Sequence, residues 1–552
     1  SPADEGYRRL EEWARQHGPA TATDDDGPGF AFFAHKVQPV LVKKGCMMMQ
    51  CHSASMFHDY RLRGGSAGSF SLSATRQNYE LSLAQMSIES EDPNASRLVR
   101  KNLYRPEVCG VAGCDKPAGI AHRGGPLFED FGAERASPEA CAAGNHDYDN
   151  GDLDKIPAYC VILEWLKRER DLHKLAPLSG IVYVKRPIGS LTRAQDFDVY
   201  APGADLRRVD TTIASGALGV TDGTDKSLTA GCGLDPRTAD IRRPQVSWDG
   251  TRVAFAARSS ASEPLAVYEM NADGSSCSKH PGINTTPPSE NGLLVHNFDP
   301  TYAPPDGGFS RIVFASTRGN LSNAAYDYQG PHRTPADPTK PNSNLYVLEP
   351  NPAAPAQTRV RQLTFLLNME RQPSFMNDGR IIFTAEKRAP GFYQLSLRRL
   401  NLDTGDYHPL YAQRGSIGFP EATQVVELAD KDFATIFSVQ ASPGGAGTLG
   451  VFNRSIGIDF TSSDPADYPV DPGVLDPAQL QAPDPAFFLR SLRFPDRAAN
   501  PRPGQPTSGF YTSPAALPST SLLVSFDPGG GDYDVYVMEP GIGAKTKLFG
   551  DP

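Results

Sequence analysis

The sequence predicts a chain of two structural parts: a mainly α-helical domain, followed by an all-β domain built as a six-bladed β-propeller. The pattern changes near residue 178, where short apolar runs separated by Gly, Pro, Asn and Asp replace helical spacing. After that point one short module recurs along the chain. In addition, 51 glycines and 49 prolines among 552 residues favour many turns and short strands over long helices.

Composition argues against some classes of partner. Charged residues make up 21% of the chain and hydrophobic residues 39%, which is ordinary for a globular protein of two or more domains. A net charge of −10 argues against nucleic acid or an anionic membrane as the main partner. The chain has no run of about 20 apolar residues, so we expect no transmembrane segment. No signal peptide is recognisable, and we interpret Ser1 as the start of a processed chain.

The domain boundaries follow from changes in sequence character. Residues 1–29 are interpreted as an N-terminal extension with a short helix, because apolar residues recur there at helical spacing among charged ones. Residues 30–177 are predicted to form the mainly helical domain, whose clearest helix spans 156–172. Residues 178–552 are assigned to the propeller.

The most informative short motif is a pair of cysteines, Cys46 and Cys51, followed directly by His52. In this pattern two thiols can add to the vinyl groups of haem, and the adjacent imidazole can take an axial position on the iron. Four residues separate the cysteines, whereas two is the common spacing. The motif predicts one covalently bound haem c with His52 as the proximal ligand, and therefore a cytochrome c-like domain at residues 30–177.

Two residues are candidates for the second axial position. His122 lies in a glycine-rich loop, where Gly124 and Gly125 would let the backbone approach a porphyrin closely. Met86 is the alternative distal ligand, because a thioether is the other common axial group. Its ordinary role would be core packing.

Two segments also have residues that suit metals other than haem iron. The soft ligands around the cysteine–histidine motif also suit copper; they are Cys46, Met47, Met48, Met49, Cys51, His52, Met56 and His58. A loop without any haem is a further interpretation of the same segment. A weaker calcium loop is suggested by Asp147, Asp149, Asp152 and Asp154 with Gly151. The glycine is one place early for an EF-hand, so a solvated acidic turn is the alternative.

Six further cysteines allow disulfide bonds. Local spacing favours the pairs Cys109–Cys114, Cys141–Cys160 and Cys232–Cys277. Buried free thiols are the alternative. An even number of cysteines beside a haem motif predicts an oxidising compartment, so we expect a periplasmic or secreted protein.

The all-β part is predicted from the recurring module. A copy has an inner strand, a tight hairpin, a buried apolar strand and then outer strands. Asp-Gly hairpins stand at 249–250, 306–307 and 378–379, and further copies begin near 181, 419 and 513. Since one such sheet cannot bury both faces alone, we expect six blades stacked around an axis. A Pro-rich insertion at 464–508 interrupts the fifth copy, and a pair of β-sandwiches is the competing fold.

These segments resemble two known groups. The module Pro244–Gly250, with Val253–Phe255 and Tyr268–Gly274 after it, resembles the Tol-type six-bladed propellers. A larger part of the chain resembles the hydrazine synthase alpha-subunit-related proteins, which join a c-type cytochrome segment to such a propeller. The matching stretches are Val37–Leu41, Asp92–Lys101, Ala121–Gly125, Tyr159–Trp165, Pro514–Pro518 and Leu522–Ser525. The resemblance implies a haem domain docked on a propeller. It does not imply hydrazine synthesis, because catalytic members of that family continue beyond the propeller into a further haem-bearing region and this sequence ends at Pro552.

The favoured function is one-electron transfer, with the propeller as a docking platform for a redox partner protein or for other subunits of a complex. A haem oxidoreductase subunit acting on a small nitrogenous substrate is the second hypothesis, which leaves enzymatic activity open. A propeller binding module without redox activity is the third. The sequence has no Gly-x-Ser-x-Gly elbow, phosphate loop or dinucleotide fingerprint, so nothing in it supports catalysis by protein side chains alone, and the catalytic residues stay unassigned.

Overall fold

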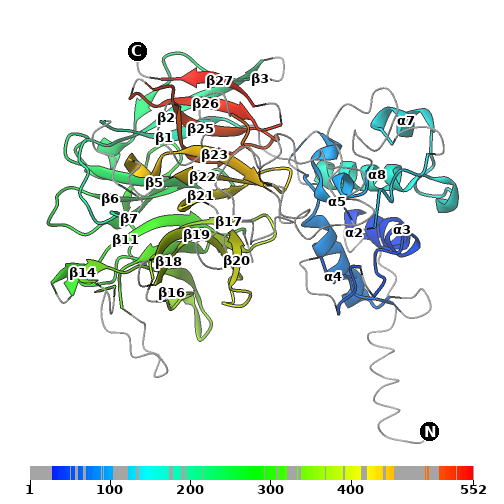
Figure 1. Ribbon diagram of the computed structural model, residues 1–552, viewed down its shortest axis with the longest axis horizontal. Coiled ribbons are helices and arrows are strands. Elements are labelled where there is room, and N and C mark those ends of the chain that lie inside the picture. The colour runs from blue at the N-terminus through cyan, green and yellow to red at the C-terminus, as the bar shows by residue number, and fades with distance from the viewer. Residues whose placement is uncertain are drawn as a thin grey trace, which may run out of the picture.

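The structure, a computed structural model, describes residues 28–172 and 178–550 apart from internal gaps, of which the longest are 104–121, 320–331, 453–491 and 497–508. We call residues 28–172 the N-terminal region and residues 178–550 the propeller. In Figure 1 the helices of the N-terminal region lie beside a larger body of β-sheets.

The N-terminal region consists of short helices joined by irregular segments. Its elements are α2 (Pro28–Phe32), the π-helical turn η2 (Phe33–Val37), α3 (Gln38–Lys43), α4 (Leu72–Leu83), η3 (Pro93–Ala95), α5 (Arg97–Arg100), α7 (Pro138–Ala143), η4 (Leu153–Lys155) and α8 (Ala158–Leu172). Among these, only α4 and α8 are longer than six residues. The prediction of a mainly α-helical, cytochrome c-like domain is therefore wrong, and the described chain as a whole is mostly β. The helix predicted at 156–172 is present as α8, whereas the one predicted in residues 1–29 lies outside the described residues.

The helices are short because the sequence repeatedly starts new ones. Ser71 and Ser137 each accept a hydrogen bond from the backbone three residues later, which caps α4 and α7. Asp92 and Asp152 cap the single turns η3 and η4 in the same way. A side-chain cap satisfies a backbone N–H at a helix start, so each of these residues favours a new start over continuation of a preceding helix.

Aromatic packing along α8 holds the N-terminal region together. Trp165 and Tyr159 on α8 are fully buried, and the Trp165 ring lies 5.2 Å from that of Phe33. The disulfide Cys141–Cys160 joins α7 to α8. The segments between the short helices are thus anchored on one long helix.

The described part of the propeller contains six blades in sequence order, of which blades 4 and 5 belong to one seven-stranded sheet. Blade 1 has β1 (Gly180–Lys185), β2 (Asp205–Ala214), β3 (Ala217–Val220) and β4 (Lys226–Ser227); blade 2 has β5 (Asp240–Val246), β6 (Arg252–Arg258), β7 (Ala266–Asn271) and β8 (Ser278–Lys279). Blade 3 has β11 (Asn297–Tyr302), β12 (Ile312–Ser316), β15 (Asn344–Asn351) and β16 (Ala354–Gln362); blade 4 has β17 (Glu370–Phe375), β18 (Ile381–Ala389), β19 (Phe392–Leu400) and β20 (His408–Tyr411). Blade 5 has β21 (Glu421–Glu427), β22 (Phe433–Ser438) and β23 (Thr448–Phe452); blade 6 has β24 (Phe510–Ala516), β25 (Leu522–Asp527), β26 (Asp534–Glu539) and β27 (Ala544–Phe549). Two small ribbons, β9 (Ser289–Glu290) with β10 (Leu293–Leu294) and β13 (His332–Arg333) with β14 (Asp337–Pro341), lie between blades 2 and 3 and within blade 3 in the sequence.

The six blades close into a ring. The first strands of successive blades contact each other, from β1 to β5, β11, β17, β21 and β24. A single parallel pair, Leu395 with Glu421, links blades 4 and 5. The ring closes where β27 contacts β3 and the Tyr183 and Phe549 rings lie 4.9 Å apart. The propeller part of the sequence prediction is therefore confirmed, and the paired β-sandwich is not observed.

The first strands of blades 2 to 6 share a backbone feature that the sequence did not reveal. Each has a register shift at a residue whose backbone is left-handed: Arg243 (φ 44), Asp299 (φ 48), Gln372 (φ 55), Gln424 (φ 57) and Ser513 (φ 54). Such a bulge turns one residue of the strand out of the ladder and leaves its backbone N–H unpaired within the sheet.

In blades 4 to 6 the bulge N–H donates to a side chain of the preceding blade. The Gln372 N–H donates to Asp299 Oδ2 at 3.0 Å, and the Gln424 N–H donates to Gln372 Oε1 at 3.2 Å. The Ser513 N–H donates to Gln424 Oε1 at 2.7 Å. We call this chain of hydrogen bonds the bulge relay. It fixes the position of each first strand against the next.

The bulge relay makes a prediction for Gln372, whose Oε1 accepts from the Gln424 N–H and the Thr384 hydroxyl. Replacing Gln372 with Leu keeps the size of the side chain but leaves buried donors without their acceptor. We expect a loss of about 1–3 kcal/mol in the free energy of unfolding, measured by urea denaturation. The same substitution at the exposed Gln357 should change it by less than about 0.5 kcal/mol. Equal effects at both positions would contradict a role for the relay.

Candidate functional site

The cysteine–histidine motif forms a compact turn after α3. The Cys46 N–H donates to Leu41 O at 2.9 Å, and the His52 N–H donates back to Cys46 O at 3.0 Å. These hydrogen bonds place His52 beside Cys46, despite the four residues between the two cysteines. Neither cysteine forms a disulfide bond; Cys46 is buried and Cys51 is exposed. Burial, with a contribution from Cys51, raises the pKa of Cys46 to about 11.

His52 is oriented by the segment that follows it. Its Nδ1 lies 3.0 Å from Tyr60 O, and its ring packs edge-on against the Tyr60 ring at 4.9 Å. Because a carbonyl oxygen can only accept, Nδ1 carries the proton and Nε2 keeps its lone pair. The buried Tyr60 is held in turn by a 2.8 Å hydrogen bond between its hydroxyl and that of Ser82. This is the support that metal-binding histidines usually have.

His122 lies opposite His52. The two ring centroids are 6.0 Å apart and the ring planes differ by 21°. His122 Nδ1 lies 3.1 Å from Gly125 O, so it too carries the proton on Nδ1. Burial, and then the charge of Lys101, lower the pKa of His122 to about 4, so its neutral form prevails near pH 7.

The backbone conformation of the turn and its close contact with the His122 ring explain why glycines stand at 124 and 125. Gly125 has a φ of 75°, which a residue with a side chain rarely adopts. A Cβ on Gly124 would lie 3.0 Å from His122 Cε1. These glycines were expected to let the backbone approach a porphyrin closely. In the structure they form the turn that holds His122.

The histidine pair suits one metal ion between the rings. Two imidazoles that bind from opposite sides with metal–nitrogen bonds of about 2.0 Å have centroids roughly 6 Å apart. The observed 6.0 Å matches this separation, and both Nε2 atoms retain a lone pair. Cys46 and Cys51 stand on the same turn as His52. The residues therefore fit a covalently attached haem.

The other candidate ligands are placed differently. Met86 is 1% exposed and belongs to the apolar core around α8, the ordinary role of a methionine. Met48 and Met49 are 66% and 80% exposed. Met56 and His58 of the copper hypothesis lie outside the described residues, so that hypothesis is untested.

The acidic segment at 147–154 does not form a cation site. Asp147 accepts from the backbone of the turn that it begins, and Asp152 caps η4. Asp154 pairs with Lys43, and Asp149 pairs with Arg168. In the described part of the chain, no group of three or more His, Cys, Asp or Glu side chains could hold a metal ion. The carboxylates therefore serve as turn caps and ion-pair partners, in line with the acidic-turn alternative.

Two of the three expected disulfides are present. Cys141–Cys160 and Cys232–Cys277 are bonded, which confirms both pairs and rules out free thiols at these four positions. Cys109 and Cys114 lie outside the described residues.

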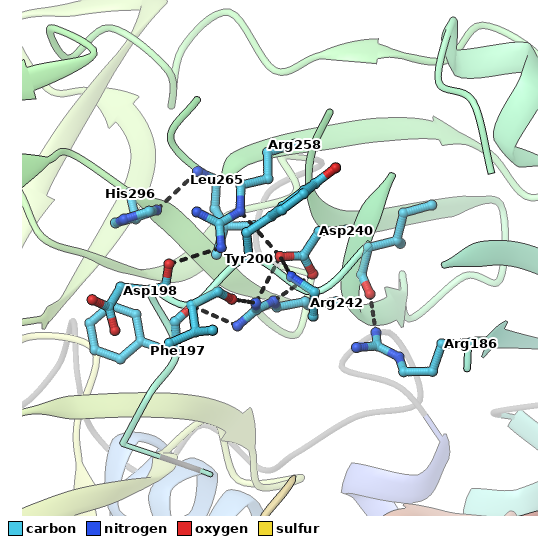
Figure 2. A network of polar contacts seen from close by, with 12 residues as sticks. Arg186, Phe197, Asp198, Tyr200, Asp240, Arg242, Arg258, Leu265 and His296 are labelled. Atoms are coloured by element: carbon cyan, nitrogen blue, oxygen red, sulfur yellow. Dashed lines mark hydrogen bonds and ion pairs between the residues drawn. The ribbon is translucent and has the colours of Figure 1, made fainter. Parts of the chain in front are cut away.

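Sequence reasoning missed a buried charge network at the centre of the propeller (Figure 2). Asp240, at the start of β5, accepts from Arg242 at 2.8 and 2.7 Å and from Arg258 at 3.1 Å. The same guanidinium groups donate to the backbone, from Arg242 to Phe197 O at 2.6 Å and from Arg258 to Asp198 O at 2.9 Å. Burial raises the pKa of Asp240, but the hydrogen bonds and charge of Arg242 outweigh it, and the net pKa is lowered.

The network holds the connection between β1 and β2 at the centre of the ring. Phe197 in this connection stacks on Phe298 of blade 3 at 4.6 Å, and Arg371 of blade 4 lies 5.7 Å from the Phe197 ring. Gln195 donates to Glu421 of blade 5. Because these partners stand on the first strands of different blades, the connection occupies the axial region of the propeller. It carries no sequence motif, which is why the sequence did not point to it.

His296 is buried next to the same network. It is 2% exposed, and its Nδ1 accepts from the Leu265 N–H at 3.0 Å (Figure 2). Burial, followed by the charges of Arg258 and Arg242, lowers the pKa of His296 to about 3. It is therefore a neutral, structural histidine.

Comparison with solved structures gives distant similarities. Hydrazine synthase from Kuenenia stuttgartiensis is 19% identical over 68% of this chain and 45% of that chain, with a TM-score of 0.46. TolB from Acinetobacter baumannii is 13% identical over 71% of this chain and 70% of that chain, with a TM-score of 0.36. A puromycin hydrolase is 16% identical over 56% of this chain and 39% of that chain, with a TM-score of 0.34. This chain thus spans less than half the length of the hydrazine synthase chain that it matches.

No protein-family description matches the chain, and no curated protein matches it. The structural similarity to hydrazine synthase is distant and does not assign a family or an activity. Membership of the hydrazine synthase alpha-subunit-related family therefore stays a prediction from the sequence.

The charge network makes a prediction for Asp240. Replacing it with Asn leaves Arg242 and Arg258 buried without their counter-charge, so we expect unfolding to become easier by about 3 kcal/mol in urea denaturation at pH 7. Because the folded pKa lies below the usual 3.8, the contribution of Asp240 is present above that pH and is lost as the pH falls through the folded pKa. When the pH falls below about 4, the free energy of unfolding should therefore decrease less for the variant than for the wild type. Asp235→Asn, at an exposed pair with Arg237, is the control with little expected change.

Proposed function

We propose that this protein is an extracytoplasmic electron-transfer protein that carries one haem c, attached at Cys46 and Cys51 and bound axially by His52 and His122. A haem supplies a one-electron redox couple when bound. The propeller then serves as a docking platform for the protein that donates or accepts the electron. A partner protein, or further subunits of a complex, follow from this proposal.

The single observation that carries the proposal is the histidine pair at 6.0 Å. His52 follows directly after Cys51 and six residues after Cys46, neither of which is in a disulfide bond, whereas His122 comes from far along the chain. Each imidazole is tied by Nδ1 to a backbone carbonyl, which directs Nε2 to the ligand role.

Two axial histidines favour electron transfer over catalysis. When His52 and His122 both bind, no axial position stays open for a substrate. Among the described residues, the Tyr60 and Gly125 carbonyls and the Tyr60 ring position the two histidines. The oxidoreductase hypothesis would require His122 to leave the site.

The two described disulfides support a location outside the cytoplasm, because such bonds persist in oxidising compartments. Covalent haem attachment at Cys46 and Cys51 would agree with the same compartment. In the part of the chain that the structure describes, no helix has both the length and the apolar character needed to cross a bilayer.

Covalent attachment is tested on the full chain, expressed in the periplasm of a host that makes c-type cytochromes. We expect a haem-stained band in a denaturing gel and one haem per chain by the pyridine haemochrome assay. Cys46→Ser and Cys51→Ser should each weaken attachment, because each removes one thioether. A wild-type chain without haem would contradict the proposal and leave the non-redox binding module.

The axial ligands are tested by His122→Ala. We expect the low-spin spectrum of the wild type to become high-spin, and the reduced protein to bind carbon monoxide, because one axial position opens. His408→Ala removes an exposed propeller histidine paired with Asp406 and is the matched control. Met86→Leu distinguishes the alternative ligand: a spectrum that changes with Met86 and not with His122 would show that the assignment is wrong.

A further inference from the structure

The N-terminal region contacts blade 5 through buried ion pairs. Arg100, the last residue of α5, donates from Nη1 to Asp430 O at 3.1 Å and lies 3.3 Å from Asp430 Oδ2. Its Nη2 donates to Asp432 Oδ2 at 3.3 Å. Arg100 and both aspartates are buried, so these contacts are largely removed from solvent.

The blade 5 hairpin that supplies these aspartates differs from its counterparts. In blade 2 the corresponding hairpin at 249–250 is exposed, whereas all residues from 428 to 432 in blade 5 are buried. Lys431 adopts a φ of 64° at the turn, where Gly250 has 72°. A left-handed backbone is disfavoured for a residue with a side chain, and such strain concentrates at sites with a function beyond the fold.

A continuous path leads from this interface to His122. Asn102 follows α5 and is held to it, because its Nδ2 donates to Leu98 O at 2.8 Å. The Phe128 N–H donates to Asn102 O at 2.9 Å, and Phe128 is fully buried. Phe128 ends the turn in which Gly125 O accepts from His122. The position of α5 therefore sets the position of the His122 turn.

We infer that the blade 5 hairpin positions His122: Asp430 and Asp432, acting through Arg100 and the Asn102–Phe128 hydrogen bond, hold the His122 turn opposite His52. The inference rests on the proposed function and extends it, because it gives the propeller a part in haem coordination. Asp430 and Asp432 are positioning residues, since they act on His122 only through α5.

The test uses the full, haem-loaded chain with the double substitution Asp430→Asn and Asp432→Asn. The amides keep the shape of the turn but lose the charge that holds Arg100. We expect haem to stay attached, while the fraction of reduced protein that binds carbon monoxide rises about tenfold, which corresponds to a loss of about 1.4 kcal/mol in ligand positioning. Asp235→Asn, an exposed aspartate of the propeller, should leave carbon monoxide binding unchanged.

Arg100→Lys is the second variant, for the case that the double variant does not fold. It keeps the positive charge but cannot reach both carboxylates with one planar group. We expect a smaller rise in carbon monoxide binding, at a melting temperature close to that of the wild type. Wild-type spectra and wild-type carbon monoxide reactivity in the folded variants would overturn the inference and leave the proposed function intact. Absence of haem from the wild type would instead contradict the proposed function.

Discussion

The propeller depends on the bulge relay between its first strands. Each blade of a propeller must pack in a fixed position against two neighbouring blades, and apolar packing alone tolerates small shifts of a strand. In blades 3 to 5 the left-handed bulge residue offers a side-chain oxygen to the bulge N–H of the next blade, from Asp299 through Gln372 and Gln424 to the N–H of Ser513. A slip of one strand would leave a buried N–H without a partner, which is costly.

Blade 2 departs from this pattern, because its arginines contact other groups at the centre of the ring. Its bulge residue is Arg243, a donor, which lies 3.8 Å from Asp299 Oδ1. The adjacent Arg242 turns to Asp240 and to the connection between β1 and β2. The positive charges of blade 2 thus serve to retain a segment of blade 1 at the axis, where the other blades use amides and carboxylates to contact each other.

The N-terminal region relies on other means, because its helices are too short to form a helical bundle. α8 supplies the only long apolar face among its described helices, and the disulfide Cys141–Cys160 ties α7 to it. His122 and the described residues after it, 124–128, form a turn. It is held by Asn102 behind α5, and α5 is held by Asp430 and Asp432 of the propeller. A site made from such loops becomes well defined only when a rigid neighbour supports it.

Particular residues show how far the sequence could lead. The Asp-Gly hairpins located blades 2 and 4, because a hairpin turn is encoded by adjacent residues. Cys141 and Cys160 were paired correctly from proximity in the chain. The mainly helical domain was predicted wrongly because the helix at 156–172 and the cysteine–histidine motif were taken to describe all of residues 30–177, where caps such as Ser71 and Ser137 begin separate helices of 12 and 6 residues. The charge network around Asp240 was invisible, since its partners come from strands and loops far apart in the sequence.

The sequence by itself determined the local chemistry of this protein: two thiols next to an imidazole, the repeated turns of a propeller, and a glycine-rich loop around His122. Only the tertiary structure decided which groups meet. It places His122 6.0 Å from His52, keeps Met86 in the core and brings Asp432 to Arg100. The physical reason is that turns, caps and cysteine motifs depend on neighbours along the chain. The distance between two histidines about 70 residues apart depends instead on how every intervening segment packs.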